Sequence, residues 1–251
     1  MQNYNAPEQL LKNKVILVTG ATDGIGKQAA LTYAKYGATV ILLARDTRKL
    51  EKVYDDIENA GYPQPAMLPV NLHNGAPEQY QQVAEVIDRE FGRLDVLLHN
   101  AGDLGLLSPI EHFDVETWNR VMQVNVNSQF LLTKYCIPLL RKSENATILF
   151  TSSGVGRQGR AYWGAYAVSK FATEGMMQVL ADELENSKIA VHSINPGATR
   201  TKMRANAYPG EDPEKLPTAQ EIMPAYLWLL DSTQKKKTGL AINARDFIRI
   251  D

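Results

Sequence analysis

Short apolar runs that alternate with longer helical patterns constrain the fold of this chain more than any other feature of its sequence. Apolar runs, many of them β-branched, occupy residues 15–18, 40–43, 66–70, 96–98, 147–150 and 190–194. Helical periodicity lies between them, at residues 26–36, 47–59, 77–91, 118–140 and 166–185. Strands that alternate with helices form βαβ units, whose parallel strands are covered on both faces. The pattern therefore predicts an α/β fold.

Right-handed crossovers turn this pattern into one doubly wound, Rossmann-type parallel β-sheet with helices on both faces. A length of 251 residues is ordinary for one α/β domain, so we predict a single domain over residues 1–251. Residues 199–218, rich in proline, glycine and charge, are the one long stretch without a regular pattern. Long loops in compact domains are often functional. We interpret this stretch as a substrate loop, with a mobile surface insertion as the alternative.

Composition excludes several classes of function. The net charge is −1, and the only basic run, at residues 235–237, is interpreted as a solvated turn, so we expect no nucleic-acid partner. No apolar run approaches the roughly 18 residues of a membrane span, and residues 1–13 lack the apolar centre of a signal peptide. Cys136 is the only cysteine, which excludes an intrachain disulfide and a cysteine metal site. We expect a cytoplasmic protein without a metal.

A glycine-rich turn follows the first predicted strand and opens the first predicted helix. The turn reads Thr-Gly-Ala-Thr-Asp-Gly-Ile-Gly over residues 19–26. Glycine permits a tight turn and lets the main chain approach a pyrophosphate, which the helix N-terminus then stabilises. The turn predicts a dinucleotide site that includes Gly20, Thr22, Asp23, Gly24, Ile25 and Gly26.

The end of the second predicted strand bears on the choice of cofactor. NAD-dependent enzymes usually place an acid there to accept from the ribose 2′-hydroxyl, but here Ala44 is followed by Arg45. An arginine can pair with the 2′-phosphate of NADP. Asp46 comes next, and we interpret it as the cap of the helix over residues 47–59. The sequence favours NADP(H), while a role of Asp46 with NAD(H) stays open.

Tyr166 and Lys170 stand four residues apart in a helical pattern, with Ser153 thirteen residues upstream. Residues at this spacing share one face of a helix. An ammonium beside a phenol favours the phenolate, so we expect the pKa of Tyr166 to lie below its usual value of about 10. The pair then offers a proton donor and acceptor near neutral pH.

Together these motifs resemble the short-chain dehydrogenase/reductase family, in its single-domain branch. The resemblance covers nearly the whole chain, and its motifs occur in order: the turn at 19–26, Asn100-Ala101-Gly102, Asn125, Ser153, Tyr166 with Lys170, and Pro196-Gly197 with Thr201. The stretches at 151–160 and 171–177 are similar to YciK-type bacterial oxidoreductases. The resemblance implies hydride transfer between a nicotinamide cofactor and a carbonyl or alcohol. The alternative is a dinucleotide-binding regulator or scaffold that does not catalyse.

The resemblance also implies a role for each residue of the motifs. Tyr166 would be the acid in carbonyl reduction and the base in alcohol oxidation, and Lys170 would lower its pKa and hold the nicotinamide ribose. Ser153 would hydrogen-bond the carbonyl oxygen, and Asn125 would position a water that links Lys170 to solvent. The implied cofactor contacts, besides those of the glycine turn, are Arg45, Asn71, Leu72, Asn100, Ala101, Gly102, Tyr166, Lys170, Pro196, Gly197, Thr199 and Thr201.

Some positions allow two interpretations or depart from the family pattern. Side chains alternate along a strand, so only one of Ser152 and Ser153 is expected to face the site, and the spacing favours Ser153. Tyr162 is a second tyrosine near the site, but the residue four positions later is Tyr166 and not a lysine, so Tyr162 cannot be activated in the same way. Asn71 stands where an aspartate commonly meets the adenine, and it still offers a carbonyl acceptor. His99 is interpreted as a packed structural residue. The segment 238–244 lacks the family's usual Asp-Gly-Gly ending, which leaves the usual C-terminal subunit contacts open.

The substrate end is less determined by the sequence. We expect a small-molecule carbonyl or alcohol in an apolar pocket formed by Leu104, Leu106, Leu107, Val155, Tyr162, Trp163 and Met203. Arg157 and Arg160 could bind an acidic group, although a surface or subunit contact is favoured for both. The helices at 118–140 and 166–185 resemble those that form the family's dimer interface, so the resemblance implies a homodimer or homotetramer.

Overall fold

The computed structural model describes residues 4–234 and 237–248. Seven parallel strands form one sheet in the order β3-β2-β1-β4-β5-β6-β7, which confirms the predicted Rossmann-type α/β fold. The strands are β1 (Val15–Thr19), β2 (Thr39–Ala44), β3 (Ala66–Pro69), β4 (Val96–His99), β5 (Ala146–Thr151), β6 (Ile189–Asn195) and β7 (Leu240–Asn243). The helices are α1 (Gly24–Lys35), α2 (Thr47–Asn59), α3 (Pro77–Phe91), α4 (Val115–Met122), α5 (Ser128–Leu140), α6 (Gly164–Glu183), α7 (Lys202–Ala207) and α8 (Met223–Leu230).

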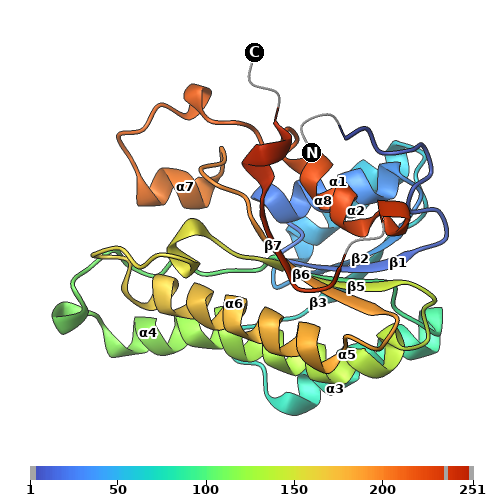
Figure 1. Ribbon diagram of the computed structural model, residues 1–251, viewed down its shortest axis with the longest axis horizontal. Coiled ribbons are helices and arrows are strands. Elements are labelled where there is room, and N and C mark those ends of the chain that lie inside the picture. The colour runs from blue at the N-terminus through green and yellow to red at the C-terminus, as the bar shows by residue number, and fades with distance from the viewer. Residues whose placement is uncertain (1–3, 235–236, 249–251) are drawn as a thin grey trace.

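Helices cover both faces of the sheet (Figure 1). One layer holds α1, α2 and α8, and the other holds α3, α4, α5 and α6. Each face has its own apolar core, because strands buried on both sides send alternate side chains to opposite faces. Along β1, for example, Ile16 packs into one core and Leu17 into the other.

The helices begin and end where local chemistry dictates. Asp46 accepts a hydrogen bond from the N–H of Lys49 at 3.2 Å, which confirms the predicted cap of α2. Pro77 opens α3, and Gly92 ends it in the left-handed conformation, with φ of 72°. Both α2 and α3 have the predicted bounds.

The long helix predicted over residues 118–140 is interrupted in the structure. It consists of α4, a π-helical turn at Gln123–Asn127, and α5. The wider turn adds one residue to the helical repeat without ending the helix, and the Ser128 hydroxyl donates to the Val124 carbonyl there at 2.6 Å. The buried Asn125 lies within this turn, facing α6.

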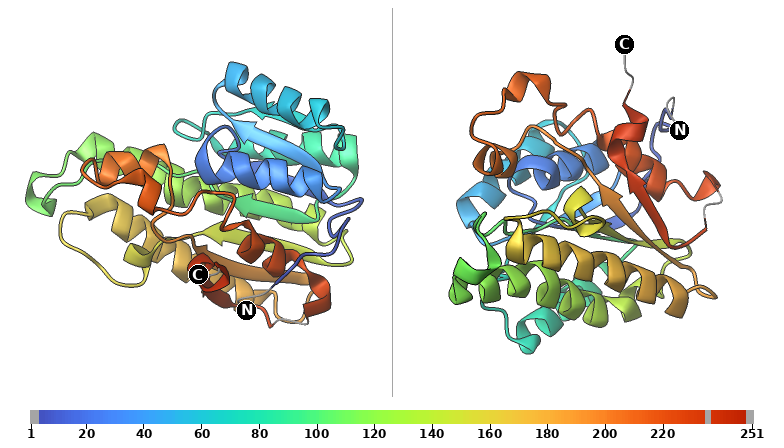
Figure 2. Two further views of the ribbon diagram at one scale, coloured as in Figure 1. Left: turned by 90° about the horizontal axis from the view of Figure 1, so that it is seen from above. Right: turned by 60° about the vertical axis from the view of Figure 1, so that its left-hand side comes forward.

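Residues 199–218 are more ordered than their composition predicts. They contain α7 and a 3₁₀ turn at Pro213–Lys215. Arg204 forms an ion pair with Glu211 and lies over the Tyr208 ring at 3.8 Å. These contacts build a folded segment that projects with the loops before α4 and α6 beyond the carboxyl end of the sheet (Figure 2).

Two further points concern the sequence predictions. Lys235 and Lys236 of the basic run lie outside the described residues, and Lys237 is exposed. No helix of the part of the chain that the structure describes combines the length and the apolarity that crossing a membrane requires.

Candidate active site

A cavity of about 870 Å³ lies along the carboxyl edge of the sheet, where the order of strands reverses between β1 and β4. Such a switch point is where open α/β sheets bind ligands. The predicted residues that line it are Gly20, Thr22, Asp23, Gly24, Ile25, Arg45, Asn71, Leu72, Asn100, Ala101, Gly102, Tyr166, Lys170, Pro196 and Thr201. The others, Gly26, Asn125, Ser153, Gly197 and Thr199, are not part of the lining but adjoin residues that are.

The glycine turn brings main chain close to main chain. Gly20 has φ of 67°, and a Cβ there would stand 2.9 Å from the Cα of Ala101. A Cβ on Gly26 would overlap the Gly20 carbonyl oxygen. α1 begins at Gly24, two residues before the predicted start, because the Asp23 carboxylate accepts the Gly24 N–H at 2.8 Å. The turn thus presents a helix N-terminus to the cavity, which suits a phosphate.

Thr19, which the sequence reasoning missed, ties this turn to the loop after β4. Its hydroxyl donates to the Leu98 carbonyl at 3.2 Å and accepts the N–H groups of Asn100 and Ala101, each at 3.0 Å. The Asn100 side chain donates back to the Thr19 carbonyl at 3.3 Å. A threonine directly before a glycine-rich turn was the available signal.

Arg45 lies at the end of β2 and is exposed on the cavity wall. Within the described residues no carboxylate pairs with it, whereas the neighbouring Asp46 is engaged with both the N–H and the ammonium of Lys49. The end of β2 therefore presents an uncompensated cation, as the sequence predicts.

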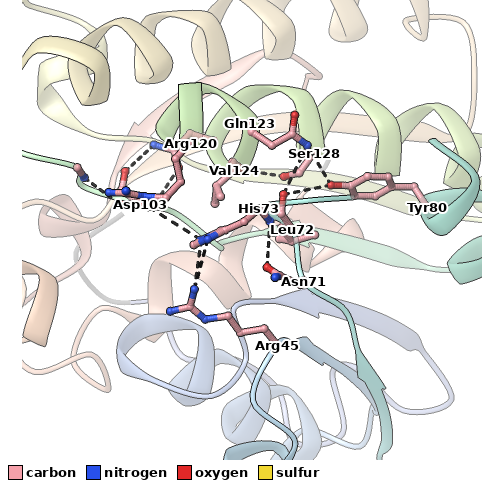
Figure 3. A network of polar contacts seen from close by, with 12 residues as sticks. Arg45, Asn71, Leu72, His73, Tyr80, Asp103, Arg120, Gln123, Val124 and Ser128 are labelled. Atoms are coloured by element: carbon pink, nitrogen blue, oxygen red, sulfur yellow. Dashed lines mark hydrogen bonds and ion pairs between the residues drawn. The ribbon is translucent and has the colours of Figure 1, made fainter. Parts of the chain in front are cut away.

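A polar cluster that sequence reasoning missed lies beside Arg45 and is formed by His73, Asp103 and Arg120 (Figure 3). Arg120 donates to Asp103 at 2.8 Å, and the Nε2 atom of His73 is 4.0 Å from the same carboxylate. The Asn71 carbonyl oxygen, expected to face an adenine, accepts the His73 N–H at 3.1 Å. Leu72 is buried, and its carbonyl accepts from the Tyr80 hydroxyl at 3.4 Å.

Tyr166 and Lys170 lie on one face of α6, as predicted, and both are buried. The predicted lowering of the Tyr166 pKa is wrong. Burial raises the pKa of the Tyr166 phenol to about 12, and a hydrogen bond with Ser153 only partly opposes this. The Tyr166 phenol therefore holds its proton across the physiological pH range.

Lys170 occupies a site that disfavours its charge. Burial lowers the pKa of the Lys170 ammonium to about 8, although the charge of Glu174 opposes the shift. The ammonium donates to the Thr151 carbonyl at 2.7 Å and lies 5.6 Å from the centre of the Tyr166 ring. Lys170 can thus change charge near neutral pH beside a phenol that cannot.

Both serines at the end of β5 reach the site, which corrects the expectation that only one does. Ser152 is buried, lines the cavity and continues the strand pairing through its N–H to the Ile194 carbonyl at 2.8 Å. Ser153 caps the following 3₁₀ turn and hydrogen-bonds the Tyr166 phenol. β5 ends at Thr151, and Ser153 lies two residues beyond that end, directly before the 3₁₀ turn, so alternation along the strand does not decide which serine reaches the site.

Asn125 is fully buried and joins the loop after β4 to α6. Its side chain accepts the Asp103 N–H at 2.7 Å and donates to the Asp103 carbonyl at 2.9 Å. It also donates to the Ser169 hydroxyl at 2.9 Å. Ser169 in turn donates to the Tyr166 carbonyl, so Asn125 holds the main chain of the site in place.

The segment after β6 closes the far side of the cavity. Thr199 is buried and donates to the Pro196 carbonyl at 3.2 Å. The N–H of Gly197, whose φ is 72°, donates to the Asn195 side chain at 3.0 Å. Thr201 caps α7 by accepting the Arg204 N–H at 3.2 Å.

Two other sequence interpretations are settled by contacts. His99 is buried, stacks on Phe150 at 4.8 Å and pairs with the Thr133 hydroxyl at 2.9 Å, which confirms a packed residue. Arg157 is held inside the chain by Glu174 at 3.0 Å and by the Asn243 side chain at 2.9 Å, so it neither faces a substrate nor serves as a free surface contact. Arg160 is exposed.

The site has the features of a dinucleotide-binding oxidoreductase, and comparison with known proteins agrees. The model of the short chain dehydrogenase family matches residues 14–212, and the chain belongs to this family of oxidoreductases.

Close relatives are bacterial. The oxidoreductase YciK of Escherichia coli K12 is 52% identical over 243 residues, covering 97% of this chain and 96% of its own, which confirms the similarity to YciK-type enzymes. A crystal structure of a Shigella flexneri short chain dehydrogenase complexed with NADP is 52% identical, with a TM-score of 0.93 over 95% of this chain and all of the other (100%). A structure from Escherichia coli CFT073 complexed with NADPH is 54% identical, with a TM-score of 0.93 and coverage of 95% and 100%.

Proposed function

We propose that this protein is an NADP(H)-dependent oxidoreductase that interconverts a carbonyl compound and an alcohol by hydride transfer. The observation that carries the proposal is the position of the buried Tyr166–Lys170 pair in a cavity whose wall also holds the glycine turn and Arg45. The whole chain would act as one domain, with residues 199–218 as the substrate loop. A regulator that only binds the dinucleotide would need no such buried acid and ammonium.

The residues present fit a phosphorylated dinucleotide. The turn at Gly20 and Gly26 has room for main chain only, and the N-terminus of α1 opens onto the cavity. Arg45 offers a guanidinium that no carboxylate of the described residues neutralises, at the end of β2, where a ribose 2′-phosphate would lie. Relatives crystallised with NADP and NADPH support the same choice of cofactor.

The chemistry divides between the cofactor and the chain. When bound, the nicotinamide supplies the hydride for the carbonyl carbon, or accepts it from the alcohol. Tyr166 would donate the proton to the carbonyl oxygen, a role that suits a phenol that stays protonated. Ser153 would stabilise the negative charge that develops on that oxygen. Lys170 would restore the proton to Tyr166, and Asn125 would hold the relay in position.

The substrate end of the cavity is apolar. Val155 and Tyr166 pack with Leu104, Trp163 and Met203 in a small cluster beside the cavity. Of the cations in the neighbouring segments, Arg157 pairs with Glu174 and Arg204 with Glu211. We infer a small-molecule substrate with an apolar group next to its carbonyl.

The first test concerns Arg45. In Arg45→Ala the affinity for NADPH should fall roughly ten- to a hundredfold, the value of a charge-assisted hydrogen bond, while the affinity for NADH stays the same. Equilibrium binding of both nucleotides measures this, with Arg48→Ala on the exposed side of α2 as the matched control. An unchanged NADPH preference in Arg45→Ala would contradict the assignment of the 2′-phosphate site.

A second copy of the chain is the expected protein partner. Val168, Phe171 and Val179 recur along one side of α6 and are 40%, 46% and 57% exposed, and Phe130 of α5 is 52% exposed. Exposed large apolar side chains that gather on one side of a helix are typical of an association site. We propose a homodimer or homotetramer that buries this side of α5 and α6, in a cytoplasmic protein.

This proposal predicts that Phe171→Glu converts the oligomer to a monomer, because it would place a carboxylate in an apolar contact. Light scattering after size exclusion measures the mass. Asn59→Glu, at the end of α2 on the opposite face of the sheet, should leave the mass unchanged. A wild-type monomer, or a Phe171→Glu variant of the wild-type mass, would contradict the proposed interface.

A further inference from the structure

His73 lies at the cavity wall between charged side chains from three different parts of the chain (Figure 3). Both of its ring nitrogens are 3.4 Å from the Nη1 atom of Arg45. On the other side, its Nε2 atom is 4.0 Å from the Asp103 carboxylate. The His73 N–H donates to Asn71, which fixes the loop that carries the ring. The imidazole is thus held against the guanidinium proposed to receive the 2′-phosphate.

The charges of this cluster leave room for one more anion. Asp103 is the only carboxylate that the described residues bring to the cluster, and it is paired with Arg120 at 2.8 Å. Burial opposes the ionisation of Asp103, but hydrogen bonds from Arg120 and from the Gly105 N–H hold its pKa below the usual value. Asp103 and Arg120 therefore compensate each other, and the charge of Arg45 remains for a ligand.

The same surroundings disfavour the protonated form of His73. Burial, and then the charge of Arg45, lower the pKa of the His73 imidazole. Asp103 opposes this shift and Arg120 reinforces it. A phosphate beside Arg45 would place negative charge next to the same ring. It would raise the pKa of the His73 imidazole, because an opposite charge nearby favours the protonated form.

We propose that His73 is a second ligand of the cofactor's 2′-phosphate and takes up a proton from solvent when NADP(H) binds. The proposal rests on the proposed function, since it requires Arg45 to receive that phosphate. It makes His73 a residue that determines cofactor specificity, because NADH has no 2′-phosphate to draw the proton.

A definite pH dependence follows. Because the bound form holds one more proton, the affinity for NADPH falls as pH rises through the pKa of His73 in the complex, by at most about tenfold per pH unit. The affinity for NADH stays flat. The other charged groups that face the ring are Arg45, Asp103 and Arg120, and the pKa of Asp103 is held below its usual value by its hydrogen bonds. The phosphate itself titrates at about pH 6. Variants must therefore be compared with the same ligand, so that the phosphate contributes equally to each measurement.

Calorimetric titration tests the proposal with adenosine 2′,5′-bisphosphate and 5′-AMP, in buffers of different ionisation enthalpy near neutral pH. The wild type should take up protons with the bisphosphate and not with 5′-AMP. His73→Gln should abolish most of that uptake and weaken the bisphosphate roughly tenfold, with 5′-AMP unchanged as evidence of an intact fold. His112→Gln, an exposed histidine outside the cavity lining, is the control.

Two results would overturn the proposal: equal proton uptake in the wild type and His73→Gln, or an equal loss of affinity for both nucleotides. Arg45→Ala separates this failure from that of the proposed function. If Arg45→Ala weakens the bisphosphate and His73→Gln does not, only the role of His73 is wrong. If neither does, the 2′-phosphate assignment is wrong as well.

Discussion

Tyr166→Phe should lower kcat for carbonyl reduction by about 10²- to 10⁴-fold, the usual contribution of a positioned acid. The substitution removes one hydroxyl and leaves the ring, which packs 5.7 Å from Trp163. The affinity for NADPH should therefore change little. Rates of NADPH consumption on a panel of apolar ketones and aldehydes, together with NADPH binding, measure the two effects separately.

Tyr162→Phe is the matched control for this experiment. Tyr162 lies four residues earlier, is 62% exposed, and has no lysine one turn later. It is not part of the cavity lining, which corrects its predicted place in the substrate pocket. Its activity should equal that of the wild type. If Tyr166→Phe kept the wild-type kcat, Tyr166 would not be the acid. The protein would then be a dinucleotide-binding protein without catalysis, or an enzyme that uses a different acid.

Lys170→Met should lower kcat by about 10²-fold or more, because the proposed proton relay to Tyr166 would lose its ammonium. Methionine keeps the apolar stem of the side chain but leaves the Thr151 carbonyl, which accepts from Lys170 at 2.7 Å, without this donor. The affinity for NADPH should fall too, since Lys170 would also hold the nicotinamide ribose. Loss of both binding and turnover distinguishes Lys170→Met from Tyr166→Phe.

The pH profile gives an independent check on Lys170. Burial places the pKa of Lys170 at about 8, so the ammonium is charged below that pH and neutral above it. Tyr166 keeps its proton to about pH 12. Reduction should therefore have a flat kcat/KM below about pH 8 and a falling one above it, and the break should disappear in Lys170→Met. A break near pH 8 that persists in Lys170→Met would belong to another group.

Most of the fold could be predicted because its elements carry local signals. α2 has its predicted bounds, since Asp46 caps it and Leu50, Val53 and Ile57 form its buried face. The buried strands read as apolar runs because both of their faces are covered. α8 was not predicted, because a short and uniformly apolar segment has no helical period that would distinguish it from a strand.

Features that depend on tertiary contacts could not be predicted in the same way. The π-helical turn at Asn125 widens one turn without ending the helix, so the sequence indicates a regular α-helix where the structure has α4, the π-helical turn and α5 in succession. Residues 199–218 contain α7, a 3₁₀ turn and the pairing of Arg204 with Glu211, none of which composition reveals.

The residues of the site also divide into those with a local signal in the sequence and those that only tertiary contacts bring together. The motif residues were found because each follows a predicted strand or lies on one helical face. His73, Asp103 and Arg120 were missed because they come from three separate elements and meet only in the folded chain. The pKa of Tyr166 was predicted in the wrong direction, because helical spacing reveals the nearby ammonium of Lys170 but not the burial that outweighs it.

The most direct test of the central claim is thermal unfolding of the wild-type protein with NADPH and, separately, with NADH. A ligand that binds only the folded state stabilises it, by about 2.7 kcal/mol at a concentration of about 100 times its Kd. We expect NADPH to raise the Tm clearly at concentrations where NADH does not, since only NADPH carries the phosphate that Arg45 would bind. A shift with NADH alone, or with neither nucleotide, would contradict an NADP(H)-dependent oxidoreductase.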